Sequence, residues 1–273
     1  MAEEVSDRIR IERVPPSGWY DGLGVDLTVP AAPGLKFHLW PQEAWGVPGE
    51  TGAHGDDWEF VRLRHLRDLE DHADGSVSYR TEGLYLPDVE FAVRIVPGPD
   101  ALDVEYRVTN RGGGRRYVTI APCLQLPDGS FGGEPTERRQ ERIWVVTKER
   151  GLTRISGTRH SAEPGGKPWS QVYFSDDAPS RPARHGFGLS PDPATAGFAA
   201  AESLDGRIVV AVATADFVAT AFALMNCLHA NPGRWCEPGE SWTARWRAYF
   251  LAGAGLDPLI ARAERDLPRL HVR

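Results

Sequence analysis

The sequence predicts an all-β fold, and three observations support this prediction. Glycine (29) and proline (22) are abundant in the chain of 273 residues, and they favour short strands joined by turns over a helical bundle. Several segments alternate apolar and polar residues with a period of two, which is typical of half-buried strands. A helical stripe of apolar residues is credible in one segment alone, residues 256–267 near the C-terminus, which leaves little of the chain for helix.

The strand prediction is strongest where alternation and turn residues occur together. Residues 89–95 and 102–108 alternate on either side of a Pro-Gly-Pro-Asp turn, and this pattern predicts a hairpin. Trp242 and Trp246 lie on the apolar side of the last predicted strand and are expected in the core. Further strands are predicted at 117–126, 143–147, 171–174, 207–214, 217–228 and 241–251.

The length suits one domain with a sizeable core, and no linker clearly divides the chain. We expect a single domain over residues 1–273, with an N-terminal segment at 1–20 and a C-terminal helix at 255–268. That helix is expected to pack on the outside of a sheet.

Charge and segment composition exclude several classes of partner. The net charge of −7 argues against a generally basic surface for nucleic acid. The sequence shows neither the pattern of a signal peptide nor an apolar run long enough for a transmembrane helix, so no membrane partner is expected. Three cysteines, an odd number at no zinc-finger spacing, suit a reduced cytoplasmic protein. Arginine far outnumbers lysine, as expected from a GC-rich, bacterial genome.

Familiar catalytic signatures are missing from the sequence. It contains no Gly-rich phosphate loop followed by Lys-Ser/Thr, no Gly-x-Ser-x-Gly elbow and no His-Glu-x-x-His motif. These absences argue against P-loop enzymes and against hydrolases that depend on a Gly-x-Ser-x-Gly elbow or a His-Glu-x-x-His motif.

Three segments carry residues suited to chemistry. In the first, residues 37–58, a turn-rich stretch combines aromatic rings, which stack on the C–H faces of sugars, with polar groups for hydroxyls. Its members of interest are His38, Trp40, Glu43, Trp45, His54 and Trp58. The alternative is a loop whose tryptophans close the end of a sandwich.

The second segment, residues 225–233, places His229 where an apolar strand is expected to pass into a Pro/Gly loop. A neutral histidine there can serve as acid or base; the alternative is a histidine hydrogen-bonded to a neighbouring loop. The third segment, 122–129, places Cys123 and Gln125 on one face of a strand. Buried free cysteines are usually inert, so Gln125 is the better candidate for a polar contact.

Metal binding is a second role to consider for residues of these segments. His38 and Glu43 partly match a metal-binding jelly roll, but the second histidine of a His-x-His pair is missing. Cys227 and His229 with Cys236 have no standard zinc spacing. We therefore expect no protein-bound metal and no cofactor.

Short motifs along the chain resemble the galactose mutarotase-like family, the aldose 1-epimerases and their relatives. The motifs are His54-Gly55 before Trp58, Tyr85-Leu86-Pro87 leading to Phe91, the strand 102–110 ending in Thr-Asn, Cys227-Leu228-His229 at the place of a family Glu-Pro element, and Pro238-Gly239-Glu240 before the last strand. The resemblance covers residues 40–251 in outline. It implies a large antiparallel β-supersandwich.

The chain departs from this family at the catalytic positions. In the epimerases a glutamate takes the proton of the anomeric hydroxyl and a histidine protonates the ring oxygen. Here the first position is His229, and the second falls near Cys123 and Gln125 without the family's His-Pro-Tyr-Phe. A pair formed by His229 and His54 would be a different solution to the same chemistry.

These observations predict a carbohydrate-active protein whose partner is a small sugar or uronic acid. Acid/base chemistry of an epimerase, isomerase or lyase type is assigned to His54 and His229, with Glu43 as a possible partner. The expected binding residues are Trp40, Trp45, Trp58, Arg62 and Gln125.

Two alternatives stay open. One is a non-catalytic carbohydrate-binding or regulatory domain that keeps the cleft, and the other is a metal-dependent β-sandwich enzyme that uses His38, Glu43 and His54. Whether the protein is an enzyme, and its oligomeric state, are not determined by the sequence.

Overall fold

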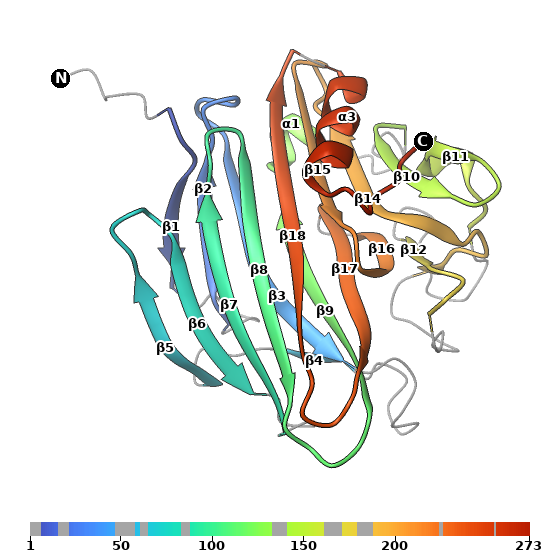
Figure 1. Cartoon of the computed structure of the whole chain (residues 1–273). Coiled ribbons are helices and arrows are strands. Elements are labelled where there is room, and N and C mark those ends of the chain that lie inside the picture. The colour runs from blue at the N-terminus through green and yellow to red at the C-terminus, as the bar shows by residue number, and fades with distance from the viewer. Residues whose placement is uncertain are drawn as a thin grey trace.

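Two β-sheets packed face to face make up most of the molecule (Figure 1). The computed structural model describes residues 7–15, 22–46, 58–60, 65–82, 88–132, 141–160, 171–178, 188–223, 226–253 and 255–273. The helical elements bounded within these ranges are α3 (Leu256–Asp266) and two short turns, α1 (Asp128–Phe131) and the 3-10 turn η2 (Ile155–Gly157), with a further 3-10 residue at His65. The predicted all-β class is confirmed.

The first sheet has nine strands in the described part of the chain. In spatial order they are β1 (Arg10–Val14), β2 (Gly24–Thr28), β3 (Lys36–Gly46), β9 (Arg116–Gln125), β17 (Cys227–Cys236), β16 (Phe217–Ala223), β12 (Gln171–Phe174) and β13 (Gly188–Leu189), with β4 (Trp58–Phe60) on β3. Neighbours are antiparallel except β12 and β13. Strands distant in sequence, β3, β9 and β17, therefore become adjacent at the centre.

The second sheet, also nine-stranded, is antiparallel throughout. Its spatial order is β11 (Gly151–Arg154), β10 (Ile143–Thr147), β14 (Ala194–Glu202), β15 (Ile208–Thr214), β18 (Ser241–Ala252), β8 (Ala101–Asn110), β7 (Val89–Pro97), β6 (Val77–Glu82) and β5 (Leu66–Asp71). The predicted hairpin is the β7–β8 pair.

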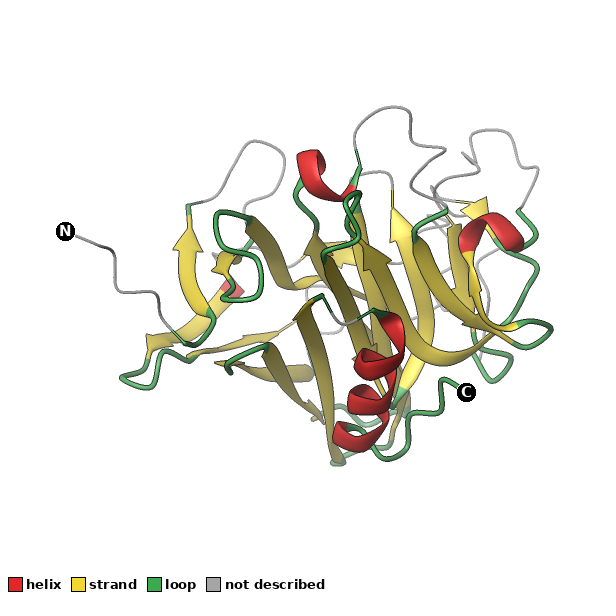
Figure 2. Ribbon diagram, turned by 90° about the horizontal axis from the view of Figure 1, so that it is seen from above, coloured by secondary structure: helices red, strands yellow, loops and turns green. Residues whose placement is uncertain are grey.

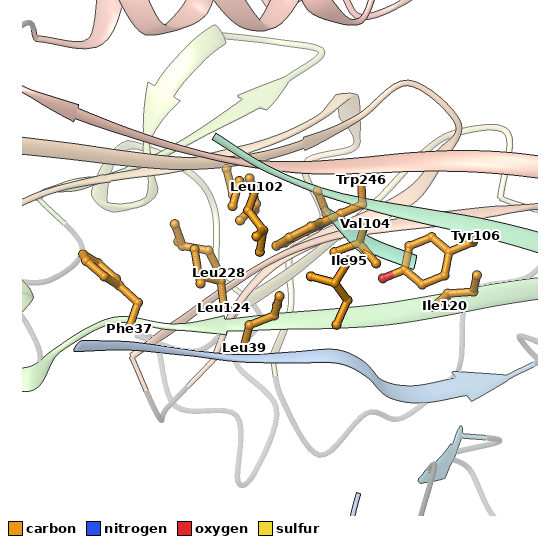
Figure 3. Packing of buried hydrophobic residues seen from close by; sticks show 14 of the residues in the cluster. Phe37, Leu39, Ile95, Leu102, Val104, Tyr106, Ile120, Leu124, Leu228 and Trp246 are labelled. Carbon is orange, nitrogen blue, oxygen red and sulfur yellow. The ribbon is translucent and has the colours of Figure 1, made fainter. Parts of the chain in front are cut away.

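The main core lies between the two sheets because each central strand turns alternate apolar side chains inward. Figure 3 shows these side chains meeting from both sheets: Phe37, Leu39, Ile120, Leu124 and Leu228 from the first, and Ile95, Leu102, Val104, Tyr106 and Trp246 from the second. Trp242 and Trp246 are 3% and 0% exposed, which confirms their predicted core position.

The helix α3 lies on the outer face of the second sheet, as predicted (Figure 2). Its buried side chains Leu259, Ile260 and Ala263 pack against outward-facing residues of β14, β15 and β18, among them Phe198 and Tyr249. The helix therefore forms a second, smaller core over part of that face. No helix in the described ranges is long and apolar enough to cross a bilayer.

One predicted strand is wrong in its extent. Within residues 217–228, β16 ends at Ala223 and β17 begins at Cys227, and Asn226 takes a positive φ of 57° at the turn before β17. Asparagine tolerates this left-handed conformation better than other non-glycine residues. An uninterrupted apolar pattern concealed the reversal because both strands are buried.

The supposed loop at Pro232 and Gly233 is also wrong, since β17 runs on through both residues. Pro232 lies opposite Phe217 at an irregularity in the β16–β17 ladder, where a missing N–H is tolerated. Gly233 lies against β9, and a Cβ there would meet Thr119 Cγ2 at 2.8 Å. His229 therefore lies within a strand rather than at its rim.

The predicted turn-rich segment at residues 37–58 begins as strand β3 instead. Its backbone pairs with β2 on one side and β9 on the other, which satisfies its hydrogen bonds. Pro41 and Gln42 lie in a bulge between Trp40 and Ala44, where the register with β9 shifts. The bulge accommodates the proline and turns Gln42 inward, to accept a hydrogen bond from Tyr79 Oη at 3.3 Å.

Candidate functional site

The outer face of the first sheet brings together residues from three central strands. Gln125 on β9 lies opposite His38 on β3 and opposite Cys227 on β17. Their neighbours along the strands, Leu39 and Leu124, are fully buried between the sheets. Because side chains alternate along a strand, His38, Gln125 and Cys227 belong to the face turned away from that core. We call this the outer-face site.

Trp40 covers one side of the site. It lies opposite Cys123 in the β3–β9 ladder and is 6% exposed, so it is a buried side chain rather than part of an exposed loop. Trp40 forms a small apolar cluster with Cys123 and Cys227. Its ring meets the imidazole of His38 edge-on, with centroids 4.5 Å apart and an interplanar angle of 75°.

His38 is held by a carboxylate on the neighbouring strand. Its Nδ1 lies 2.9 Å from Oδ1 of Asp26, which lies directly opposite it on β2. Lys36 Nζ donates to the other oxygen of Asp26 at 3.1 Å. Burial by itself raises the pKa of Asp26, but hydrogen bonds and charge from His38 and Lys36 outweigh it and lower the pKa. Asp26 thus stays ionised and orients the imidazole.

Gly24 on β2 makes room for the same ring. A Cβ built on Gly24 would lie 2.7 Å from Cε1 and 2.8 Å from Nε2 of His38, closer than side-chain atoms approach each other. The imidazole therefore occupies the space that a side chain at position 24 would fill. Glycine at position 24 leaves this space open for the imidazole, and its φ lies outside the left-handed region, so close approach rather than backbone conformation accounts for the glycine.

His229 lies deeper in the site, next to two thiols. It is 8% exposed, and its Nε2 lies 3.2 Å from Sγ of Cys227. By the register of the β9–β17 ladder, His229 lies opposite Cys123. The ligand atoms of Cys123, Cys227 and His229 are all within 4.8 Å of one another, an arrangement able to hold a metal ion.

Several predicted site residues cannot be assigned a position for their side chains. His54 and Arg62 lie outside the described residues. Glu43, Trp45 and Trp58 are described as backbone only, in β3 and β4, where Gly46 pairs with Trp58. Their proposed roles stay predictions. Of the predicted set, the structure brings Trp40, Gln125 and His229 to one face.

Sequence reasoning missed Asp26 and the grouping of the two cysteines. Asp26 lies in a short strand that was not predicted. A polar residue within a segment such as Val-Asp-Leu-Thr is common in surface strands, so the local sequence does not mark Asp26 as a site residue. Cys227 and Cys123 belong to strands that meet only through the sheet topology. Cys236, considered with them from sequence, lies at the far end of β17 and its Sγ contacts the Glu240 carbonyl at 3.4 Å.

A separate hollow occupies the opposite side of the molecule. A groove of about 870 Å³ runs over the outer face of the second sheet beside α3, lined from β5, β6, β7, β8 and β18. Four of its arginines already pair with carboxylates: Arg80 with Asp68, Arg94 with Asp74, Arg245 with Asp103 and Arg269 with Asp216. No histidine or tryptophan occurs among the described residues that line it. The first sheet therefore has the better combination of groups for chemistry.

The outer-face site combines three chemical properties. Trp40 offers an aromatic surface, His38 with Asp26 offers an oriented imidazole, and Gln125 offers an amide that donates and accepts hydrogen bonds. His38 retains 21% exposure of its side chain, against 8% for His229 as a residue. A ligand approaching this face meets His38 more readily than His229.

Comparison with known proteins gives similarity to solved structures only. No protein-family model matches the chain, and no curated protein matches it. A galactose mutarotase-like protein from Lactobacillus casei is 12% identical over 88% of this chain and 100% of its own, with a TM-score of 0.45. One from Clostridium acetobutylicum is 8% identical over 90% and 100%, with a TM-score of 0.46.

The Slr1438 protein from Synechocystis is 11% identical over 89% of this chain and 92% of its own, with a TM-score of 0.48. The family that the sequence motifs resemble is the one named for the proteins from Lactobacillus casei and Clostridium acetobutylicum. Identities this low carry no information on activity.

Proposed function

We propose that the outer face of the first sheet binds a small carbohydrate, a sugar or uronic acid, between β3 and β17. The observation that carries the proposal is the grouping of Trp40, His38 and Gln125 on adjacent strands of that face. An aromatic ring beside paired hydrogen-bonding groups is the combination that sugars require. Two strand spacings, about 9.5 Å, separate β3 from β17, a span that accommodates one pyranose ring.

We assign proton transfer on this ligand to His38, with Asp26 as its positioning residue. A general acid or base must reach the proton that it moves. The contact of His229 Nε2 with Cys227 Sγ at 3.2 Å directs that nitrogen toward the thiol. His38 is more exposed, and its Nδ1 contact with Asp26 leaves Nε2 as the nitrogen for exchange. The predicted pair of His54 and His229, with Glu43, is the alternative assignment.

A carbohydrate-binding domain without catalysis is the second candidate. Trp40 is only 6% exposed, so much of its surface already packs against protein groups. A site of this kind would bind sugar through Gln125 and His38 without turnover. The two candidates differ in one measurable property, which is the exchange of protons or of anomers in bound sugar.

The test begins with a panel of neutral monosaccharides and uronic acids screened by saturation-transfer NMR. Wild-type protein should bind at least one member, and Trp40→Ala should weaken that binding at least tenfold. Trp235→Ala is the matched control, because Trp235 lies farther along β17, opposite Tyr117. Equal binding by wild type and Trp40→Ala would contradict the site, as would an absence of saturable binding across the panel.

Turnover is then measured on the bound sugar by NMR exchange between anomers and by deuterium incorporation from solvent. His38→Ala should abolish exchange while leaving binding measurable. Loss of exchange in His229→Ala but not in His38→Ala would favour the alternative assignment. Binding without any exchange would identify the protein as a carbohydrate-binding domain.

A further inference from the structure

Two thiols and an imidazole converge under Trp40 in a part of the site that carbohydrate binding does not use. Cys123 is 1% exposed, Cys227 3% and His229 8%. We propose that these three residues form a binding site for a thiophilic metal ion, Zn²⁺ in preference to Cu⁺. The inference goes beyond the proposed carbohydrate function and does not depend on it.

The separations between the ligand atoms suit a metal. Zinc binds sulfur at about 2.3 Å and nitrogen at about 2.0 Å, so neighbouring ligand atoms in a tetrahedral site lie roughly 3.5–3.8 Å apart. Here Cys227 Sγ and His229 Nε2 are 3.2 Å apart, and all three ligand atoms lie within 4.8 Å of one another. Side-chain movements on the order of 1 Å are enough to complete the coordination.

The strands that carry the ligands are held rigidly. β9 is paired with β3 and β17, and β17 is paired with β9 and β16, so neither strand is at an edge. Leu124 and Leu228, which flank the ligands in sequence, are 0% exposed in the main core. The backbone positions of the ligands are therefore fixed by packing, and binding requires little ordering of the chain.

A disulfide between the two thiols is disfavoured by their register. Cys227 lies opposite Gln125 and Leu228 opposite Leu124, and the continuation of this register places Cys123 opposite His229, so the cysteines are diagonal neighbours. Diagonal residues on antiparallel strands have Cα atoms about 7–8 Å apart, whereas disulfides span about 4.4–6.8 Å. A metal ion bridges this separation without displacing either strand. Neither cysteine forms a disulfide in the structure.

The donor set selects the metal. Two thiolates and an imidazole are soft ligands that suit zinc and copper(I) over magnesium or calcium. Zn²⁺ with two thiolates is neutral overall, whereas Cu⁺ with two thiolates leaves a net negative charge in a buried site, where an uncompensated charge is costly. Binding Zn²⁺ replaces the proton of each thiol by a metal bond, so two protons are released and no electron is transferred.

Three protein ligands leave one coordination position for a fourth ligand, as in zinc sites that keep an open position. His229 would then use Nε2, its nitrogen beside Cys227 Sγ, for the metal and not for proton transfer. This agrees with the assignment of proton transfer to His38. It also gives His229 and Cys123 a role that the carbohydrate site alone does not supply.

The experiment uses the full chain without an affinity tag, reduced and stripped by a chelator. Titration with Zn²⁺ followed by calorimetry should show one equivalent bound and, in buffers of different ionisation enthalpy, about two protons released. Co²⁺ as a spectroscopic probe should show thiolate-to-metal charge-transfer absorption. Competition with Cu⁺ in parallel tests the metal preference. Zn²⁺ should bind more tightly, because its two positive charges balance the two thiolates.

Single variants identify the ligands. Cys123→Ser, Cys227→Ser and His229→Ala should each weaken Zn²⁺ binding at least tenfold, whereas Cys236→Ser, the matched control, should bind as wild type does. Cys236 is equally buried but contacts Glu240 instead of the cluster. Wild-type affinity in the three ligand variants, or equal loss in Cys236→Ser, would overturn the proposal.

A measurement on unaltered protein covers the case in which a variant does not fold. Zn²⁺ should slow alkylation of Cys123 and Cys227 at moderate denaturant, with Cys236 as the internal reference in the same mass spectrum. Equal protection of all three thiols, or of none, contradicts the site. Failure of zinc binding with intact sugar binding removes only this inference, and the reverse result removes only the proposed function.

Discussion

His38 Nδ1 and Asp26 Oδ1 lie 2.9 Å apart across the β2–β3 ladder, on the outer face of the first sheet. The two residues are directly opposite in register, so the pairing is set by backbone geometry rather than by a flexible loop. Each is about one-fifth exposed (21% and 23% for the side chains), which keeps the pair accessible to a ligand but partly shielded from solvent. A histidine oriented by a carboxylate can exchange a proton through its other nitrogen.

Replacing the carboxylate tests this pairing. Asp26→Asn keeps a hydrogen-bond acceptor but removes the charge, so we expect turnover of bound sugar to fall about tenfold while binding affinity changes little. The measurement is the rate of anomer exchange against the dissociation constant. Lys36→Gln serves as a comparison because Lys36 contacts the same carboxylate from an exposed position. An equal loss in both variants would show that general electrostatics, not the orientation of His38, is responsible.

The space beside Gly24 provides a second test that leaves His38 itself intact. Gly24→Ala places a methyl group within 2.7 Å of His38 Cε1 and 2.8 Å of Nε2, so the ring must leave its position against Trp40. We expect loss of turnover and a changed imidazole environment in NMR spectra. Gly113→Ala, with no atom near the added carbon, is the control and should behave as wild type. An unchanged imidazole signal in Gly24→Ala would refute the argument.

A pH-dependent contact attaches α3 to the β7–β8 turn. Arg262 donates hydrogen bonds to Asp100, and this contact lowers the pKa of Asp100 below its ordinary value of 3.8. A carboxylate with a lowered folded-state pKa adds stability above its unfolded pKa, and this stability is lost as pH falls through the folded value. Stability from this pair should therefore be fully present at neutral pH, begin to decline below about pH 4 and be lost as the pH falls through the lower folded-state pKa.

Asp100→Asn should lower the free energy of unfolding at pH 7 by about 0.5–1 kcal/mol, since the Asp100 side chain is 38% exposed and solvent screens the pair. Urea denaturation at pH 7 and at pH 3 should show this difference shrinking in acid. Asp71→Asn, which breaks an exposed pair with Arg13, is the control and should have a smaller effect at either pH. A difference that grows in acid would have the wrong sign for this pair.

The main core depends on large side chains from the second sheet. Trp246 is 0% exposed between the sheets (Figure 3), so Trp246→Ala should lower the free energy of unfolding by about 3–5 kcal/mol through lost burial and a new cavity. Leu204→Ala is the comparison, because Leu204 is 42% exposed and should cost below about 1 kcal/mol. Chemical denaturation measures both, and similar losses would contradict the assignment of the core.

The sequence predicted elements whose pattern is local. The β7–β8 hairpin combines alternation with a Pro-Gly turn, and α3 combines an apolar stripe with a proline in its first turn, so both were located within a few residues. The strand β3 was not predicted as a strand, because Pro41 interrupts its pattern and only the bulge against β9 makes the proline tolerable. The boundary at Asn226 was missed because two buried strands share one apolar run.

What the sequence by itself determined is the all-β class, the core position of Trp242 and Trp246, and the outward packing of α3, since each follows from periodicity within one segment. Which residues form a site was decided by tertiary structure. Cys123 meets Cys227 and His229, and His38 meets Asp26, only because the sheet order makes β9 a neighbour of β17 and β2 a neighbour of β3. Strand order and register depend on long-range pairing, which leaves no periodic trace in a single segment.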